Sequence, residues 1–485
     1  MKILIMNNNE NQKKNKLPKK LKFNLWYNDI IERAGIMDIR YPIKGLYVWY
    51  PFGFKIRKLV FSIIKKLMDS TGHEEVLFPT LIPKTEFMKE SLHIQGFEKE
   101  VYWITKGGNT KLDIDLALRP TSETSIYPIF KLWIRSHIDL PIKIYQIVNT
   151  FRYETKSTKP LIRLREITSF KEAHTVHETE SQSNSQIKKA INIYNKFFSL
   201  LCISTLNIKR PFWDKFPGSD YTIAFDTIMP DGKSLQVGTV HNLGTNFSKT
   251  YDIKYEDKNG IQKYVFQTCY GISERCIASL IAIHGDDNGL VLPPNIAPIQ
   301  VVIIPIVSKL EKNNIYNECK RIYYILKKNN IRVYLDDSEQ RPGYKYYKWE
   351  LKGVCLRLEI GSSEVKENTI ILVNRSTKIR EKINKENLLN IINIKLKEEE
   401  KILFSNSIKL LKENISYHDN INDIINKNIK SVIKVPLCDS EKCGIEIEGI
   451  SKLTLLGHDL KDHNYNNCIV CKNKTKYIFY LSKKY

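Results

Sequence analysis

Apolar residues recur at spacings of three and four in the first strongly patterned segment of the chain. Such a stripe is typical of an amphipathic helix that packs on a core. Gly72 suits the position just past the end of this helix, and Glu75 to Phe78 is predicted to be a strand that Pro79 stops. The stripe consists of Ile56, Leu59, Val60, Ile63, Ile64, Leu67 and Met68.

The pattern becomes mostly strand-like from Val101 to about Ala297, with turn signals such as Lys106-Gly107-Gly108 and Pro230-Asp231-Gly232. One strongly helical piece lies in this region, from Arg275 to His284. A sheet with few helices is therefore predicted here.

Beyond a boundary near Pro298, short apolar runs alternate with helical stretches. This alternation implies an α/β unit with parallel strands. From about Lys382 the chain becomes long and helical, with a second boundary near Ile394, and it ends in a cysteine-bearing segment from Val435. The α/β unit is predicted to hold strands Gln300–Ile306, Ile331–Leu335, Arg357–Ile360 and Thr369–Val373, and helices around Leu310–Asn329 and before Gly353.

Length and charge add a domain count and a class of partner. The chain has 485 residues, which corresponds to about three domains. Lys and Arg number 76 against 53 Asp and Glu, a formal charge of +23. This surplus favours a polyanion partner, whether nucleic acid, a phosphorylated substrate or an anionic membrane, and the alternative is a Lys-rich proteome.

Targeting and redox features indicate the cytoplasm. No window approaches the roughly 18 consecutive apolar residues of a transmembrane helix. The apolar stretch Ile3 to Met6 is too short for a signal-peptide core. Residues 1–22 are therefore predicted to be a disordered basic tail and not a signal peptide. Nine cysteines are an odd number, which argues for a reducing compartment.

Two basic segments carry candidate phosphate chemistry. Phe151-Arg152-Tyr153-Glu154 is followed by a basic loop and then Arg163-Leu164-Arg165-Glu166. Two strands joined by that loop would bring Arg152 and Arg163 together, and guanidinium groups bind phosphate oxygens at two points. A solvated, charged hairpin is the alternative reading of this segment alone.

A third segment, Tyr270-Gly271-Ile272-Ser273-Glu274-Arg275, leads into the predicted helix. Glycine lets the backbone approach a ligand closely, and an arginine beside the N–H groups of a helix start makes an anion site.

In this order, the helix and strand ending at Pro79, the FRYE segment and the Gly271–Arg275 segment resemble motifs 1, 2 and 3 of the class II aminoacyl-tRNA synthetases. Three further segments resemble the prolyl-tRNA synthetases within that class, and the resemblance covers about residues 23 to 485. These segments are Arg119-Pro120-Thr121-Ser122-Glu123-Thr124, Thr239-Val240-His241-Asn242-Leu243-Gly244 and Trp349-Glu350-Leu351-Lys352-Gly353.

The resemblance implies a mixed α/β fold in three domains. Residues 23–297 would form an α+β catalytic domain with the antiparallel sheet of class II synthetases. Residues 298–393 would form an α/β anticodon-binding domain, and residues 394–485 a small α/β domain of the C-terminal zinc-binding type. Only about a hundred residues separate Arg165 from Gly271, so no editing domain is expected between motifs 2 and 3.

The implied activity is ATP-dependent attachment of L-proline to tRNA(Pro) through prolyl-adenylate. Arg152 and Arg275 would be catalytic, and Mg²⁺ would bridge the phosphates. The family's ATP-binding positions correspond to Arg152, Glu154, Arg163, Gln236, Thr239 and Arg275. Its proline-binding positions correspond to Thr121, Glu123, Arg152, Phe170, Glu172, His174, His241 and Ser273.

Some positions depart from the family pattern. Ile167 stands where many class II enzymes have Phe, Cys269-Tyr270 where motif 3 often begins with Trp, and Phe170 where the family often has Trp. None of these changes removes a phosphate-binding charge. The family's C-terminal Tyr carboxylate can approach the active site, and Tyr485 is the corresponding residue here.

The second domain is expected to read the anticodon. Glu350, Lys352 and Arg357 are the candidates, because carboxylates accept from guanine N1 and N2 while cations bind O6, N7 or phosphate. A solvated helix face is the alternative. The resemblance also implies a homodimer through the motif 1 region and no membrane partner.

Two close cysteine pairs near the C-terminus, separated by 24 residues, fit a structural zinc site with four thiolates. The pairs are Cys438 with Cys443 and Cys468 with Cys471. Two disulfides or unligated thiols are the alternatives.

Two competing functions follow from the same motifs. One is another class IIa synthetase, for threonine, glycine or histidine; a threonyl enzyme would need a Cys/His/His zinc cluster, and no matching cysteine is expected in the catalytic region. The other is a non-catalytic tRNA-binding paralogue, but such proteins usually lose arginines that this chain keeps at 152, 163 and 275.

Overall fold

The computed structural model describes residues 17–89, 98–307, 311–425, 429–463 and 466–485. The described residues divide into two compact units: those within 17–41, 47–61 and 280–407 form the first, and those within 42–46, 62–279 and 408–485 form the second. The three predicted domain boundaries stay a prediction. No helix among the described ranges is long and apolar enough to cross a membrane.

Part of the predicted tail is packed. Residues 1–16 lie outside the described residues, but Leu17 is buried and Lys20 Nζ donates to the carbonyl of Ile283 at 3.0 Å and to that of Gly285. The expectation of a solvated tail is therefore wrong for this stretch, where a lysine caps the end of a helix.

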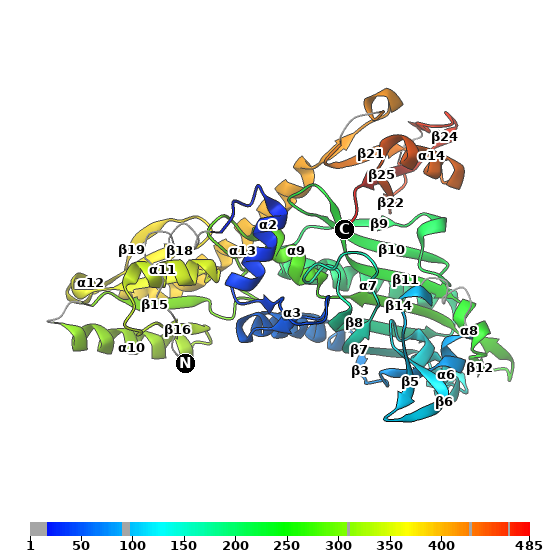
Figure 1. Cartoon of the computed structure of the whole chain (residues 1–485), viewed down its shortest axis with the longest axis horizontal. Helices are drawn as coiled ribbons and strands as arrows, with labels where there is room; N and C mark the ends of the chain where they lie inside the picture. Colours follow the sequence, from blue (N-terminus) through cyan, green and yellow to red (C-terminus); the bar gives the residue numbers. More distant parts are fainter. Residues whose placement is uncertain (1–16, 90–97, 308–310, 426–428, 464–465) are drawn as a thin grey trace. The chain divides into compact units, whose positions relative to one another are not determined.

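The second unit is organised by an eleven-stranded sheet (Figure 1). Its pairings are antiparallel except β20 with β21 and β3 with β7. In sheet order the strands are β20 (Ile415–Tyr417), β21 (Val432–Pro436), β25 (Ile478–Ser482), β22 (Thr454–Asp459), β9 (Leu206–Lys209), β10 (Tyr221–Ile228), β11 (Ser234–Gly244), β14 (Phe266–Ile272), β8 (Glu166–His177), β7 (Ile142–Phe151) and β3 (Glu74–Glu75).

Two long helices of this unit interrupt the predicted run of strands: α6 (Glu123–Trp133) and α7 (Glu180–Leu200). Helix α7 begins with a capping box between Thr179 and Gln182, and its apolar side packs on β8, β11 and β14. The remaining elements are α4 (Lys84–Phe87), α8 (Asn246–Thr250), α14 (Glu441–Ser451), the sheet β4 (Leu81–Pro83), β6 (Thr110–Leu118) and β5 (Tyr102–Gly107), and the hairpins β12 (Lys254–Glu256) with β13 (Gln262–Tyr264) and β23 (Asn466–Asn467) with β24 (Lys474–Thr475).

The first unit contains a five-stranded sheet in the order β16 (Val333–Leu335), β15 (Val301–Pro305), β17 (Leu356–Ile360), β18 (Thr369–Asn374) and β19 (Arg380–Asn384). The predicted parallel pairing holds for β15 with both neighbours, whereas β17, β18 and β19 pair antiparallel. Its other elements are α2 (Phe23–Arg33), β1 (Met37–Asp38), β2 (Val48–Trp49), α10 (Lys312–Lys328), α11 (Pro342–Leu351) and α12 (Ser362–Lys366). Helices α3 (Pro51–Asp69), α9 (Arg275–His284) and α13 (Leu388–Glu413) contain residues of both units.

Two local predictions need correction. The strand expected at Glu75 to Phe78 is shorter than predicted and consists of β3, Glu74–Glu75. It does not continue to Phe78, because the Phe78 N–H donates to the Gln146 side chain at 2.9 Å and not to a neighbouring strand. The strands expected to carry Arg152 and Arg163 stop at Phe151 and restart at Glu166, so both arginines lie in the connecting loop.

Candidate functional site

A cavity of about 370 Å³ lies in the second unit and is lined by every residue that the sequence proposed for proline and ATP. These residues come from the start of α6 and the segment just before it, the loop between β7 and β8, the two strands β8 and β11, and the turn that leads into α9 together with the first residue of that helix. They are Thr121, Glu123, Arg152, Glu154, Arg163, Phe170, Glu172, His174, Gln236, Thr239, His241, Ser273 and Arg275.

Strand alternation explains one wall of the cavity. Side chains two residues apart on a strand point to the same face, so Phe170, Glu172 and His174 on β8 all line it. On the neighbouring strand β14, Gly271 pairs with Glu172. A Cβ at Gly271 would lie 3.1 Å from the Phe170 ring, so a larger residue there would require that ring to shift by a few tenths of an ångström.

The arginines form the cationic part of the cavity. Arg152 Nε donates to the Pro120 carbonyl at 3.2 Å, and Arg275 Nε donates to the Ile162 carbonyl at 2.8 Å. Burial lowers the pKa of Arg152, and burial together with the charge of Arg152 lowers the pKa of Arg275 to about 10. Because the positive charge of Arg152 disfavours that of Arg275, an anion with several negative charges would be stabilised between these arginines.

A buried carboxylate also lines the cavity. Thr121 Oγ1 donates to Glu123 Oε2, and Cys269 Sγ donates to Glu123 Oε1 at 3.5 Å. Because Glu123 is only 3% exposed, a cation that reached it would meet a carboxylate already oriented and largely dehydrated.

Hydrogen-bonding neighbours hold the other polar groups of the cavity in place. Glu172 Oε1 accepts from Ser122 Oγ and from Gln146 Nε2 at 2.8 Å, and Tyr127 OH lies 3.1 Å from His174 Nδ1. Thr222 Oγ1 lies 2.8 Å from His241 Nδ1. Side chains held in this way keep their geometry without a ligand.

The sequence missed several residues of this cavity. Arg210 donates to both carboxylate oxygens of Asp226, at 3.0 and 3.1 Å, and to Gln236 Oε1 at 2.7 Å. The Phe216 ring lies 4.5 Å from that of His241. The order of the strands in the sheet brings these residues together, and the only signal in the sequence is the charged Asp226 within the otherwise apolar run of β10.

One cysteine of the catalytic region does lie beside the cavity's polar groups, but it meets one histidine and a carboxylate and not the two histidines of a threonyl-type cluster. Ligand atoms of Glu123, His174 and Cys269 all lie within 4.8 Å of one another. Burial raises the pKa of the Cys269 thiol well above its usual range, with Glu123 adding to the shift, so this group acts here as a hydrogen-bond donor to the carboxylate.

The anticodon candidates separate into two places in the first unit. Glu350 and Arg357 line a second cavity of about 240 Å³, together with Arg375, Lys378 and Arg380. Lys352 does not line it; its Nζ lies 4.4 Å from the centre of the Phe52 ring instead.

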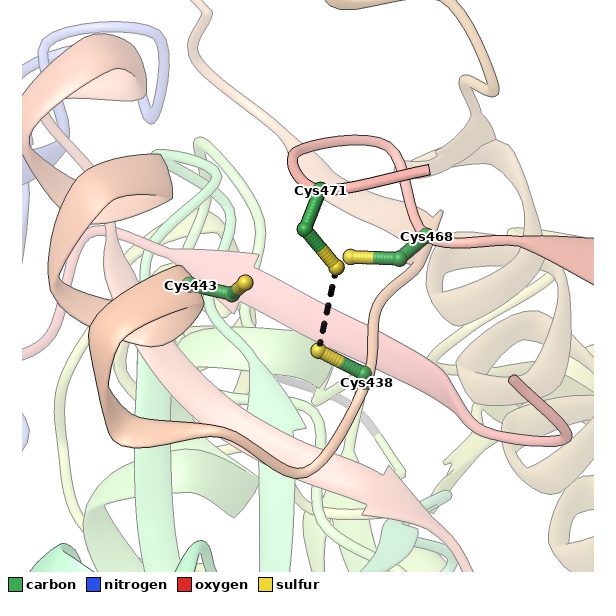
Figure 2. Close-up of side chains that lie close together, drawn as sticks. All are labelled: Cys438, Cys443, Cys468 and Cys471. Carbon is green, nitrogen blue, oxygen red and sulfur yellow. Dashed lines mark hydrogen bonds between the residues drawn. The ribbon is translucent and has the colours of Figure 1, made fainter. Parts of the chain in front are cut away.

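The four C-terminal cysteines converge in the second unit. Figure 2 shows their sulfur atoms turned toward one another, with Cys443 on α14 and the others in adjoining loops. The sulfurs lie within 4.8 Å of each other, and those of Cys438 and Cys471 are 3.8 Å apart. Tetrahedral zinc with Zn–S bonds of about 2.3 Å requires S···S separations of roughly 3.8 Å, so this donor set fits zinc.

Three family profiles match the chain. The class II tRNA synthetase core domain (G, H, P, S and T) matches residues 102–284. An anticodon binding domain matches residues 300–395, and the C-terminal domain of prolyl-tRNA synthetase matches residues 418–485.

Similar proteins match over nearly the whole chain. The proline–tRNA ligase of Methanococcoides burtonii is 52% identical over 98% of this chain and 100% of its own length. That of Methanocaldococcus jannaschii is 51% identical over 92% of this chain and 98% of its own. The structure of Giardia lamblia prolyl-tRNA synthetase in complex with prolyl-adenylate aligns with a TM-score of 0.93 at 35% identity, over 96% of this chain and 99% of that one.

Proposed function

The chain belongs to the prolyl-tRNA synthetases, and from this we propose that it joins L-proline to tRNA(Pro) in two steps through prolyl-adenylate, with the cavity of Arg152, Arg275 and Glu123 as its active site. The observation that carries the proposal is a single cavity lined both by arginines that suit phosphates and by a buried carboxylate that suits the amino group. Full-length similarity to proline–tRNA ligases favours this over the threonyl, glycyl and histidyl alternatives and over a non-catalytic paralogue.

Pyrophosphate exchange over a panel of amino acids tests the specificity. Proline should support exchange, while threonine, glycine and histidine should not. Exchange with another of these amino acids in place of proline would overturn the assignment, and no exchange at all would favour the non-catalytic paralogue.

In the first step a proline carboxylate oxygen attacks the α-phosphorus of ATP, a P–O bond forms to the amino acid, and the bond to pyrophosphate breaks. The step needs positioning and charge stabilisation rather than proton transfer. Arg152 would neutralise the α-phosphate and the proline carboxylate, while Arg163 and Arg275 would hold the outer phosphates.

The nucleotide would lie against Glu154, Gln236 and Thr239. Arg210 fixes the amide of Gln236, so this contact is preorganised. Mg²⁺ prefers oxygen ligands. The carboxylate of Glu274 lines the cavity and would serve as such a ligand; when bound, the ion would offset phosphate charge.

Proline would place its ammonium group between Thr121 and Glu123 and its ring against Phe170. The remaining pocket residues would surround the rest of the molecule: Glu172, His174, His241 and Ser273. A secondary ammonium desolvated in the cavity needs an anionic partner, and Glu123 is the buried carboxylate that Thr121 orients.

Replacing Glu123 with glutamine should raise the KM for proline about ten- to a hundredfold while leaving that for ATP nearly unchanged, because a charge-assisted hydrogen bond is lost at one substrate only. Exchange kinetics with each substrate varied in turn measure this. Glu180→Gln, at the exposed start of α7, is the matched control. A parallel rise in both KM values would show that Glu123 supports the whole site rather than proline.

We propose that the second cavity reads an anticodon base through Glu350 and Arg357. Lys378 Nζ pairs with the Glu350 carboxylate, which keeps that side chain at the cavity, and Arg357 lies 3.0 Å from Glu359 Oε1. Lys352 would bind the tRNA backbone, because it stands outside the cavity.

Glu350→Ala should raise the KM for tRNA about ten- to a hundredfold in aminoacylation, the loss typical of one specific base contact, with exchange unchanged. Glu367→Ala, an exposed carboxylate of the same unit, is the control. An equal effect of both changes would indicate bulk charge and not base recognition.

Three further features complete the proposal. The four C-terminal thiolates would bind structural Zn²⁺. A homodimer would form through the motif 1 region, where Leu77 is 81% exposed beside Pro79, and a mass of twice 56.7 kDa in solution tests it. All nine cysteines are unbonded, which supports a cytoplasmic location that cell fractionation can check.

A further inference from the structure

The segment after β9 places an exposed aromatic ring at the edge of the proposed active site. Phe212 is 71% exposed, although its neighbours in the chain, Arg210 and Asp214, both line the main cavity. A single exposed ring is common on protein surfaces, so what surrounds Phe212 decides whether it has a partner.

The ring stands on a firmly anchored turn, the 3₁₀ helix Phe212–Asp214. Trp213 packs against the C-terminal hydrophobic cluster, so tightly that a Cβ at Gly444 would lie 2.3 Å from its ring. On the other side Phe216 stacks on His241 inside the cavity. These two contacts hold the turn in place, so the Phe212 side chain is not needed to anchor it.

Four lysines lie around this edge of the cavity, which we call the rim: Lys159, Lys215, Lys233 and Lys484. Lys215 Nζ lies 4.0 Å from the centre of the Phe212 ring, and Lys484 pairs with Asp214 at 3.0 Å. Lys159 and Lys233 lie 4.7 and 4.9 Å from the ring of Tyr485, which lines the cavity. An aromatic ring among lysines is the combination that binds single-stranded nucleic acid, since bases stack on the ring and cations meet phosphates.

We propose that Phe212 is a stacking platform for a base of the single-stranded 3′ end of tRNA, with Lys215 and the rim lysines facing its phosphates. The inference rests on the proposed function, because the second step must bring a terminal ribose hydroxyl to the adenylate in this cavity. Phe212 would thus be a positioning residue for transfer and take no part in proline activation.

The test separates the two steps. Phe212→Ala should leave proline-dependent pyrophosphate exchange unchanged and should lower kcat/KM for tRNA aminoacylation about five- to a hundredfold, the range of one lost base stack. Phe212→Trp, which keeps a stacking surface, should retain aminoacylation. Tyr324→Ala, which removes a similarly exposed ring on α10 of the other unit, is the control and should change neither activity.

A binding measurement locates the contact. Full-length tRNA(Pro) should bind Phe212→Ala more weakly than it binds the unmodified protein, whereas tRNA lacking its single-stranded 3′ nucleotides should bind both equally. Unchanged aminoacylation by Phe212→Ala, or an equal loss of affinity with both tRNAs, would overturn the platform. Loss of exchange in the unmodified protein would instead overturn the proposed function.

Discussion

Replacing Arg152 with alanine is expected to lower proline-dependent pyrophosphate exchange about a thousandfold without unfolding the protein. The guanidinium lines the cavity and donates to the Pro120 carbonyl, and in the proposed function it would neutralise the α-phosphate and the proline carboxylate. Loss of one preorganised donor to a developing negative charge costs roughly a hundred- to a thousandfold in rate, and here the positive charge is lost as well. The measurement is exchange at saturating ATP and proline.

Two companion variants make the result specific. Arg152→Lys keeps the charge but not the planar fork, so it should recover only part of the lost rate. Arg165→Ala changes a second arginine of the same loop, one that lies over the Tyr153 ring at 4.4 Å and does not line the cavity. Its effect should be much smaller. Near-normal exchange by Arg152→Ala, or equal losses at both positions, would contradict the role of Arg152.

The family resemblance predicted the residues of the cavity better than the hydrophobic patterns predicted the elements that build it. Glu172 and His174 lie on one strand, two residues apart, and strand alternation alone puts them on the same face. Helix α7 was missed because its polar first half obscures the helical spacing of Ile187, Ala190 and Tyr194 within a strand-like region. This error does not affect the predicted residues of the cavity, because α7 packs on the strands and does not line the cavity.

Contacts across the sheet could not be read from spacing. Arg210, Asp226 and Gln236 meet only because β9, β10 and β11 are neighbours, and nothing in a single sequence fixes that order. The separation of Lys352 from Glu350 has a simpler cause. Residues two apart at the end of a helix point in different directions, so one cavity cannot hold both side chains.

Removing the metal from the four-cysteine cluster is expected to have the largest effect on stability. We expect the purified protein to contain about one zinc ion per chain, and Cys468→Ser to contain none. Cys443 and Cys468 are also buried in the apolar cluster under β21, β22 and β25, so loss of the metal would loosen strands that belong to the main sheet. Structural zinc sites contribute on the order of 10 kcal/mol to folding in small domains.

Metal analysis, thermal unfolding and limited proteolysis together measure this effect. Cys468→Ser should lower the unfolding midpoint and expose the segment after residue 408 to protease, while Cys319→Ala, in a helix of the other unit, should keep its zinc. Loosening of these strands should also slow pyrophosphate exchange, because Lys484 and Tyr485, which follow β25 in the chain, line the main cavity. A metal-free protein in which four cysteines still resist alkylation after denaturation would favour disulfides. A metal-free protein of full stability in which all nine cysteines are alkylated after denaturation would show that the cluster works without zinc.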